Sequence, residues 1–242
     1  MDREDVTCLV ACETLKQELN LVMRKRACTL PVHWIDAGRH AWPDKLRESI
    51  QETLDGLPGG RTVLLLFGFC GNAMVGVNSG MHTLVVPRTA DCIPLFIGSQ
   101  KERDSYGTGT YFFTEGYFNS GGSIASDASR VVQRYGEKRG LHIFKKMFCH
   151  YRDFAVIDTG AFDVSELLTK VTQFAAQIDI PVKVIPGNLR LIDALLSRNW
   201  PEGDFLIVKP GVSVSFEDSL QVGKTIYTAN GHKFPKCTKF SG

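Results

Sequence analysis

Short, uninterrupted apolar runs alternate along the chain with segments whose apolar residues recur every three or four positions. The first pattern is typical of strands covered on both faces, and the second of amphipathic helices. Strands are predicted at residues 6–11, 33–36, 62–67, 83–86, 154–157, 182–185 and 205–208. Helices are predicted at residues 13–26, 43–54, 92–97, 123–135, 141–151, 164–178 and 189–197. Because alternating strands and helices favour parallel pairing, we expect an α/β fold with a mainly parallel, Rossmann-like sheet flanked by helices.

The stretch at residues 106–118 departs from this pattern because it is polar and rich in aromatic residues. It is predicted to be a loop with a short hairpin-like segment that folds over the sheet. Its aromatic side chains suit a lid or a partner surface, with packing in the core as the alternative; they are Tyr111, Phe112, Phe113, Tyr117 and Phe118.

No low-complexity linker divides the chain. Residues 1–222 are therefore expected to form one α/β domain, and two pseudo-repeated lobes around a single cleft remain an open arrangement. Residues 223–242 are expected to form an irregular C-terminal tail.

The composition narrows the class of protein. The chain has 242 residues and a formal net charge of +2, a balance too mild to indicate a nucleic-acid partner. No apolar run approaches the roughly 20 residues of a membrane span, so no membrane partner is expected. The charged segment 1–5 has no apolar signal core behind it, which predicts a cytoplasmic location.

Three of the seven cysteines follow the ends of predicted strands, and these are Cys12, Cys70 and Cys92. An odd number of cysteines in a chain without an export signal argues against a disulfide framework. In open parallel sheets, ligands bind at the carboxyl ends of the strands. If the three strands are neighbours, these cysteines lie close together at the end of the sheet where active sites usually form.

Three converging thiolates would suit a metal centre. Zinc held by Cys12, Cys70 and Cys92 would keep a fourth position open, as catalytic zinc does, and could activate a thiol for methyl transfer or a water for hydrolysis. The same ligands could hold a [4Fe–4S] cluster with one unligated iron. Two other interpretations stay open: the cysteines are packing residues beneath a glycine-rich cleft, or one of them is a redox-active or nucleophilic thiol.

Three charged residues are candidates for catalytic roles. Arg88 could bind a substrate carboxylate or phosphate, and Asp91 could orient a ligand, although the two could instead pair with each other and hold the loop. Glu18, less than two helical turns after Cys12, could act as a general base in the cleft or be a solvated helix residue.

Glycine-rich segments supply candidate cofactor-binding residues. Gly71 lies in the segment 68–77, which follows a predicted strand. Gly121, Gly122 and Ser123 open a predicted helix, whose free N–H groups attract anions. Neither segment matches a nucleotide-binding motif, so a nucleotide is not specifically indicated.

Four segments together resemble the DUF1638 family, which is named for its unknown function. They are residues 11–15 (Ala-Cys-Glu-Thr-Leu), 67–71 (Phe-Gly-Phe-Cys-Gly), 87–93 (Pro-Arg-Thr-Ala-Asp-Cys-Ile) and 157–160 (Ile-Asp-Thr-Gly), and the resemblance extends over about residues 6 to 211. The resemblance implies that the protein is associated with corrinoid-dependent methyl-transfer proteins.

The sequence thus favours a metal-dependent cytoplasmic enzyme that acts on a small molecule, with its three-cysteine site linked to corrinoid or one-carbon chemistry. The alternative is a non-catalytic accessory protein that holds a corrinoid, a small anion or a partner methyltransferase in the same cleft.

Overall fold

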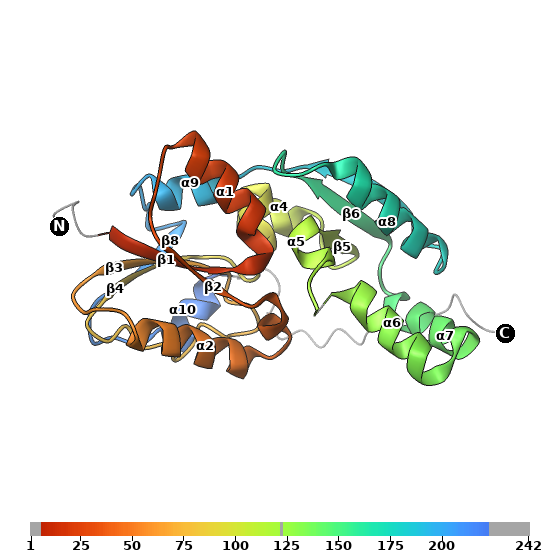
Figure 1. Cartoon of the computed structure of the whole chain (residues 1–242), viewed down its shortest axis with the longest axis horizontal. Coiled ribbons are helices and arrows are strands. Elements are labelled where there is room, and N and C mark those ends of the chain that lie inside the picture. Colours follow the sequence, from red (N-terminus) through yellow and green to blue (C-terminus); the bar gives the residue numbers. More distant parts are fainter. Residues whose placement is uncertain (1–5, 122, 223–242) are drawn as a thin grey trace.

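The computed structural model describes residues 6–121 and 123–222 and contains two β-sheets (Figure 1). The larger sheet has the order β2-β1-β3-β4-β8, and the smaller has the order β5-β6-β7. All neighbouring strands run parallel except β4 and β8. The strands are β1 Val6–Cys12, β2 Val32–Ile35, β3 Thr62–Leu66, β4 Thr83–Pro87, β5 Thr110–Phe113, β6 Asp153–Asp158, β7 Val182–Pro186 and β8 Phe205–Val208. The predicted α/β class with mainly parallel pairing is confirmed.

Helices flank both faces of the larger sheet, with α1 and α9 on one side and α2 and α10 on the other (Figure 1). Proline at position 43 starts α2, and its Leu46, Ile50 and Leu54 form the buried face. The helices are α1 Lys16–Lys25, α2 Pro43–Asp55, α3 Ile93–Ile97, α4 Gln100–Ser105, α5 Glu115–Phe118, α6 Ile124–Tyr135, α7 Glu137–Phe148, α8 Val164–Ala176, α9 Arg190–Leu196 and α10 Phe216–Gln221. Two 3₁₀ helices, Glu13–Leu15 and Ala37–Ala41, complete the set in the described ranges.

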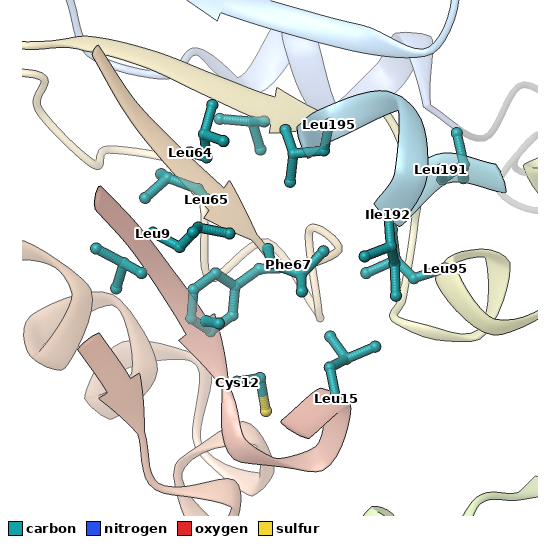
Figure 2. Close-up of a cluster of buried hydrophobic side chains, with 14 of the residues drawn as sticks. Leu9, Cys12, Leu15, Leu64, Leu65, Phe67, Leu95, Leu191, Ile192 and Leu195 are labelled. Carbon is teal, nitrogen blue, oxygen red and sulfur yellow. The ribbon is translucent and has the colours of Figure 1, made fainter. Parts of the chain in front are cut away.

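The core of the larger unit extends to the carboxyl ends of its strands. Leu9 of β1 and Leu64 and Leu65 of β3 are inaccessible to solvent. Figure 2 shows Leu64 next to Leu195 of α9, with Cys12 at the edge of the same cluster. The cavity described below therefore begins where this apolar core ends.

The strands β5 and β6 of the smaller sheet are largely buried on both faces, and the two faces belong to different cores. Phe112, Ala155 and Ile157 face the core of the larger unit. Phe113 and Phe154 alternate with them and belong to a second apolar cluster with α6, α7 and α8. This alternation attaches the smaller sheet to the larger unit.

The stretch at residues 106–118 differs from the sequence prediction. Residues 110–113 form β5, which pairs in parallel with β6, and residues 115–118 form α5. A hairpin requires local antiparallel pairing, whereas the partner of β5 lies about 40 residues further along the chain.

The arrangement as two pseudo-repeated lobes stays a prediction. The two sheets differ in strand number, with five strands in the larger sheet and three in the smaller. The predicted tail, residues 223–242, lies outside the described residues. Among the helices of the described residues, none has the length and apolar character needed to cross a membrane.

Candidate functional site

A cavity of about 590 Å³ lies at the carboxyl ends of β1, β3 and β4, between these strand ends and the smaller sheet. Cys12, Cys70 and Cys92 all line it. The sulfur atoms of Cys70 and Cys92 are 3.4 Å apart. The structure thus brings the three sequence-predicted cysteines together in one place.

Backbone contacts between the loops after β3 and β4 hold Cys70 next to Cys92. The amides of Phe69 and Cys70 donate to the carbonyl oxygens of Thr89 and Ala90, at 2.8 and 2.9 Å. Gly68 makes this approach possible, since a Cβ there would lie 2.3 Å from the carbonyl group of Asp91. Any larger residue at position 68 would push the two loops apart.

The backbone at Cys70 adopts an unusual conformation. Cys70, Gly71 and Asn72 have positive φ angles of 44°, 68° and 69°. For a cysteine this left-handed conformation costs on the order of 1 kcal/mol or more, and such strain tends to occur at functional sites. Gly71 lines the cavity, as predicted for a cofactor-binding residue, and its lack of a side chain relieves part of the strain.

The thiols of Cys12 and Cys92 are held in their protonated form. Burial and, to a smaller extent, the nearby Cys92 raise the pKa of Cys12 to about 12, although the Thr14 hydroxyl donates a hydrogen bond to the Cys12 sulfur at 3.2 Å. The hydrogen bond with Cys70 and burial raise the pKa of Cys92 well above its ordinary value. A bound cation would reverse this preference, because it stabilises thiolates.

Asp91 and Arg103 form an ion pair in the wall of the cavity. Asp91 accepts a hydrogen bond from the Ile93 amide at 2.9 Å, which fixes the start of α3. Its other oxygen lies 3.5 Å from Nε of Arg103. The Asp91 side chain is 42% exposed, but the surrounding protein removes enough water to raise its pKa, an effect that Arg103 partly offsets.

Arg103 lines the cavity, and sequence reasoning missed it. It belongs to α4, a short polar helix without an apolar stripe that could have revealed it. Its guanidinium lies 4.9 Å from the centre of the Phe112 ring.

The smaller sheet and its neighbours supply an aromatic wall. Tyr111 and Tyr117 line the cavity, and their hydroxyl oxygens are 2.6 Å apart. Burial raises the pKa of both phenols, so they are neutral hydrogen-bonding groups. Of the aromatic residues predicted to form a lid or a core, Phe112 also lines the cavity, whereas Phe113 and Phe118 pack in the second apolar cluster.

Glu18 lies outside the lining of the cavity, at the junction between the larger unit and the smaller sheet. Its side chain is fully buried, and Oε1 accepts a hydrogen bond from the Thr159 hydroxyl at 3.0 Å, while Oε2 has no partner. Burial raises the pKa of Glu18 to about 7, and the nearby Glu115 adds to the shift. The predicted solvated alternative is therefore wrong, and the geometry does not place Glu18 as a base in the cavity.

Arg88 also lies outside the lining of the cavity. Its Nε donates to the carbonyl oxygens of Glu202 and Phe205 at 3.0 and 3.2 Å, and Nη1 donates to Gln221 at 3.1 Å. These contacts attach β8 and α10 to the end of β4. Arg88 does not form the predicted pair with Asp91, whose cationic partner is Arg103.

The predicted anion-binding segment at the start of α6 is separate from the cavity. Gly121 and Ser123 are not among the lining residues, and Ser123 is fully buried. Gly122 lies outside the described residues.

The spacing of Cys70 and Cys92 is compatible with a shared metal ion. Two sulfurs on a tetrahedral zinc ion, with bonds near 2.3 Å, would lie about 3.8 Å apart, close to the 3.4 Å between these thiols. As the side chains stand, the described residues contain no group of three or more His, Cys, Asp or Glu side chains arranged to hold a metal ion. Cys12 lines the same cavity, and it lies near enough to Cys92 for Cys92 to raise its pKa.

Comparison with known proteins gives one match. The family model described as a protein of unknown function (DUF1638) matches residues 34–196, a segment that includes Cys70, Cys92 and Arg103. No curated protein and no solved structure matches the chain. The matched segment covers more than half of the sequence, and the chain therefore belongs to the DUF1638 family.

Proposed function

We propose that the cavity is the active site of a metal-dependent enzyme whose metal ion is held by Cys12, Cys70 and Cys92. The observation that supports this most strongly is the meeting of three cysteines, from three separate strand ends, in one cavity of about 590 Å³. The strained backbone at Cys70 is a second supporting observation, because strained residues cluster at functional sites.

Zinc is the ion that this donor set suits best, with a [4Fe–4S] cluster as the alternative. Three protein ligands leave one position for a substrate, and a metal ion there would supply Lewis-acid activation of a thiol or water. The chain's own residues would position the ligands of the metal ion and shield one of them from water. The loops after β3 and β4 position the sulfurs of Cys70 and Cys92, and the apolar surroundings of Cys12 keep water away from its sulfur.

For the reaction, we propose methyl transfer linked to corrinoid or one-carbon chemistry. The support is the family resemblance together with the suitability of a thiolate-bound metal for activating an acceptor thiol. In such a transfer the acceptor thiol loses its proton and forms the S–CH₃ bond, while the cobalt–carbon bond of the donor breaks and its electron pair stays on cobalt.

The test is demethylation of methylcob(III)alamin in the presence of a small thiol without oxygen, followed by the change in the corrinoid spectrum. The wild-type chain is expected to show turnover, and Cys70→Ser to lose at least about tenfold of it. Cys28→Ser is the matched control, since Cys28 packs beside the core outside the cavity lining. Absence of turnover in the wild type, or equal turnover in Cys70→Ser, would contradict this function.

A second candidate is a non-catalytic accessory protein that binds a corrinoid, a small anion or a methyltransferase. The aromatic wall formed by Tyr111, Phe112 and Tyr117 favours its small-anion form, because partly apolar cavities of this size bind small molecules. A corrinoid protein should then bind stoichiometrically to the variant with Cys12, Cys70 and Cys92 all changed to Ser. Loss of this binding would exclude an accessory role that is independent of the cysteines.

A further inference from the structure

We propose that the cavity binds a small organic anion, with Arg103 holding its carboxylate or another oxyanion group and the aromatic wall holding its apolar body. This inference names a ligand class for the cavity of the proposed function. It depends on Arg103 rather than on the cysteines, so the two proposals can fail separately.

Arg103 is a positioned cation with unused hydrogen-bonding capacity. Its side chain is only 16% exposed, and it lies in the lining of the cavity. Nη1 donates to the Gly107 carbonyl at 3.1 Å, and the Phe112 ring supports the guanidinium from one side. These contacts fix the guanidinium plane before a ligand arrives, which lowers the entropic cost of binding.

The contact with Asp91 leaves part of this capacity unsatisfied. The distance of 3.5 Å from Nε to the carboxylate is within ion-pair range but too long for a good hydrogen bond. Nε is buried and has no hydrogen-bond partner. The guanidinium has hydrogen-bonding capacity beyond its contacts with Gly107 and Asp91, and an anion in the cavity would use it through charge-assisted hydrogen bonds.

The phenols in the lining carry no charge that would repel an anion. Burial holds Tyr111 and Tyr117 neutral. Arg103 is the cationic side chain in the lining that the structure describes, and Asp91 is its only carboxylate there.

The rest of the lining indicates an apolar body for the ligand. Leu46, Phe67, Ile93 and Phe96 come from the larger unit, and they face the aromatic wall of the smaller sheet. A volume of about 590 Å³ is in the range of small-molecule pockets. A compact organic anion with a hydrocarbon or aromatic body fits this combination better than inorganic phosphate does.

The experiment compares three carboxylates with their neutral amides by isothermal titration calorimetry on the as-purified chain. The probes are butyrate, 3-mercaptopropionate and 3-phenylpropionate, each paired with its own amide. For at least one pair, the carboxylate is expected to bind at least about tenfold more tightly than the amide, because a hydrogen bond to a charged group is worth about 1.5–3 kcal/mol.

The variants assign this preference to Arg103. Arg103→Met is expected to abolish it, and Arg103→Lys to keep only part of it, because an ammonium lacks the planar fork. Arg103→Lys also serves if Arg103→Met melts at too low a temperature to be measured. Arg88→Met is the matched control, since Arg88 lies outside the cavity lining, and it should keep the full preference.

Cys70→Ser separates this proposal from the proposed function. It should keep the carboxylate preference whether or not it still binds metal. The proposal is overturned if no carboxylate binds more tightly than its amide, or if Arg103→Met keeps the preference. Loss of the preference in Cys70→Ser would also overturn it, because binding would then depend on the cysteines.

Discussion

The two sheets use the same structural position, the carboxyl ends of parallel strands, for different purposes. In the larger sheet, the ends of β1, β3 and β4 place Cys12, Cys70 and Cys92 around a cavity. In the smaller sheet, the ends of β6 and β7 are covered by the larger unit. The Thr159 hydroxyl donates to Glu18 of α1 there, and the Asn188 amide donates to the carbonyl of Phe96 in α3 at 2.7 Å.

From this difference we infer that the ends of parallel strands form a cavity only where no other segment of the chain packs against them. The strands β1, β3 and β4 run parallel, as do all three strands of the smaller sheet, so strand direction alone does not distinguish the two sheets. In the larger sheet the loops after β3 and β4 contact each other and leave space beyond them. In the smaller sheet the loops after β6 and β7 contact the larger unit through Thr159 and Asn188, and these contacts stabilise the junction.

Among the substitutions that test the difference between the two sheets, Gly68→Ala is expected to have the largest effect. The added Cβ would lie 2.3 Å from the backbone of Asp91 and would force the loops after β3 and β4 apart. We expect Gly68→Ala to lose bound metal and to lower the free energy of unfolding by about 2 kcal/mol or more. Metal analysis and urea unfolding measure the two effects.

Gly203→Ala is the control for this substitution, because a Cβ at Gly203 would have no atom within 4 Å. It should keep both metal and stability. A Gly68→Ala variant with the metal content of the wild type would contradict the role assigned to the loop contact.

Gly116→Ala tests the junction instead of the site. A Cβ on Gly116 would lie 2.2 Å from the carbonyl oxygen of Thr14, where α5 meets the 3₁₀ helix Glu13–Leu15. We expect a loss of about 2 kcal/mol in the free energy of unfolding and only a partial loss of metal, because Thr14 contacts the Cys12 sulfur whereas Cys70 and Cys92 are held by other contacts. If Gly116→Ala lost its metal as completely as Gly68→Ala, the site and the junction would not be separate.

Glu18→Gln tests the buried carboxyl at the junction through the pH dependence of the free energy of unfolding. Burial raises the pKa of Glu18 from 4.5 to about 7, so the folded chain holds this proton more tightly than the unfolded chain does. Stability is therefore expected to fall as the pH rises from about 4.5 to about 7, by up to about 3 kcal/mol. Glu18→Gln removes this fall and should be more stable than the wild type at pH 8 by about 1–3 kcal/mol.

Urea unfolding at pH 5 and pH 8 measures this difference. Glu166→Gln is the surface control, since Glu166 is 65% exposed and pairs only with Lys170. An equal effect of Glu18→Gln at both pH values would show that the carboxyl of Glu18 does not titrate in this range.

The sequence predicts those features that depend on local pattern. The apolar runs at β1, β3 and β4 are long enough to mark strands that are buried on both faces, and the cysteines that follow them indicated the correct end of the sheet. The position of Gly68 between β3 and Cys70 is also visible in the sequence, although its close approach to Asp91 is not.

The features that depend on contacts between distant segments were not predictable in the same way. Arg88 was expected in the cavity, but β8 pairs antiparallel with β4 and brings its own carbonyl groups to the Arg88 guanidinium. Arg103 was missed because α4 has no buried residues to give it a periodic pattern. The pairing of β5 with β6 crosses about 40 residues, which no local signal specifies.

The central claim is that three cysteines at the strand ends hold a metal ion, and metal content tests it most directly. The protein is purified without oxygen, and elemental analysis and the visible spectrum are recorded for the wild type, Cys28→Ser and Cys70→Ser. We predict about one zinc per chain, or about four irons with broad visible absorbance, in the first two and a clear loss in Cys70→Ser. A metal-free, colourless and well-folded wild type would contradict the claim and favour the accessory binding role.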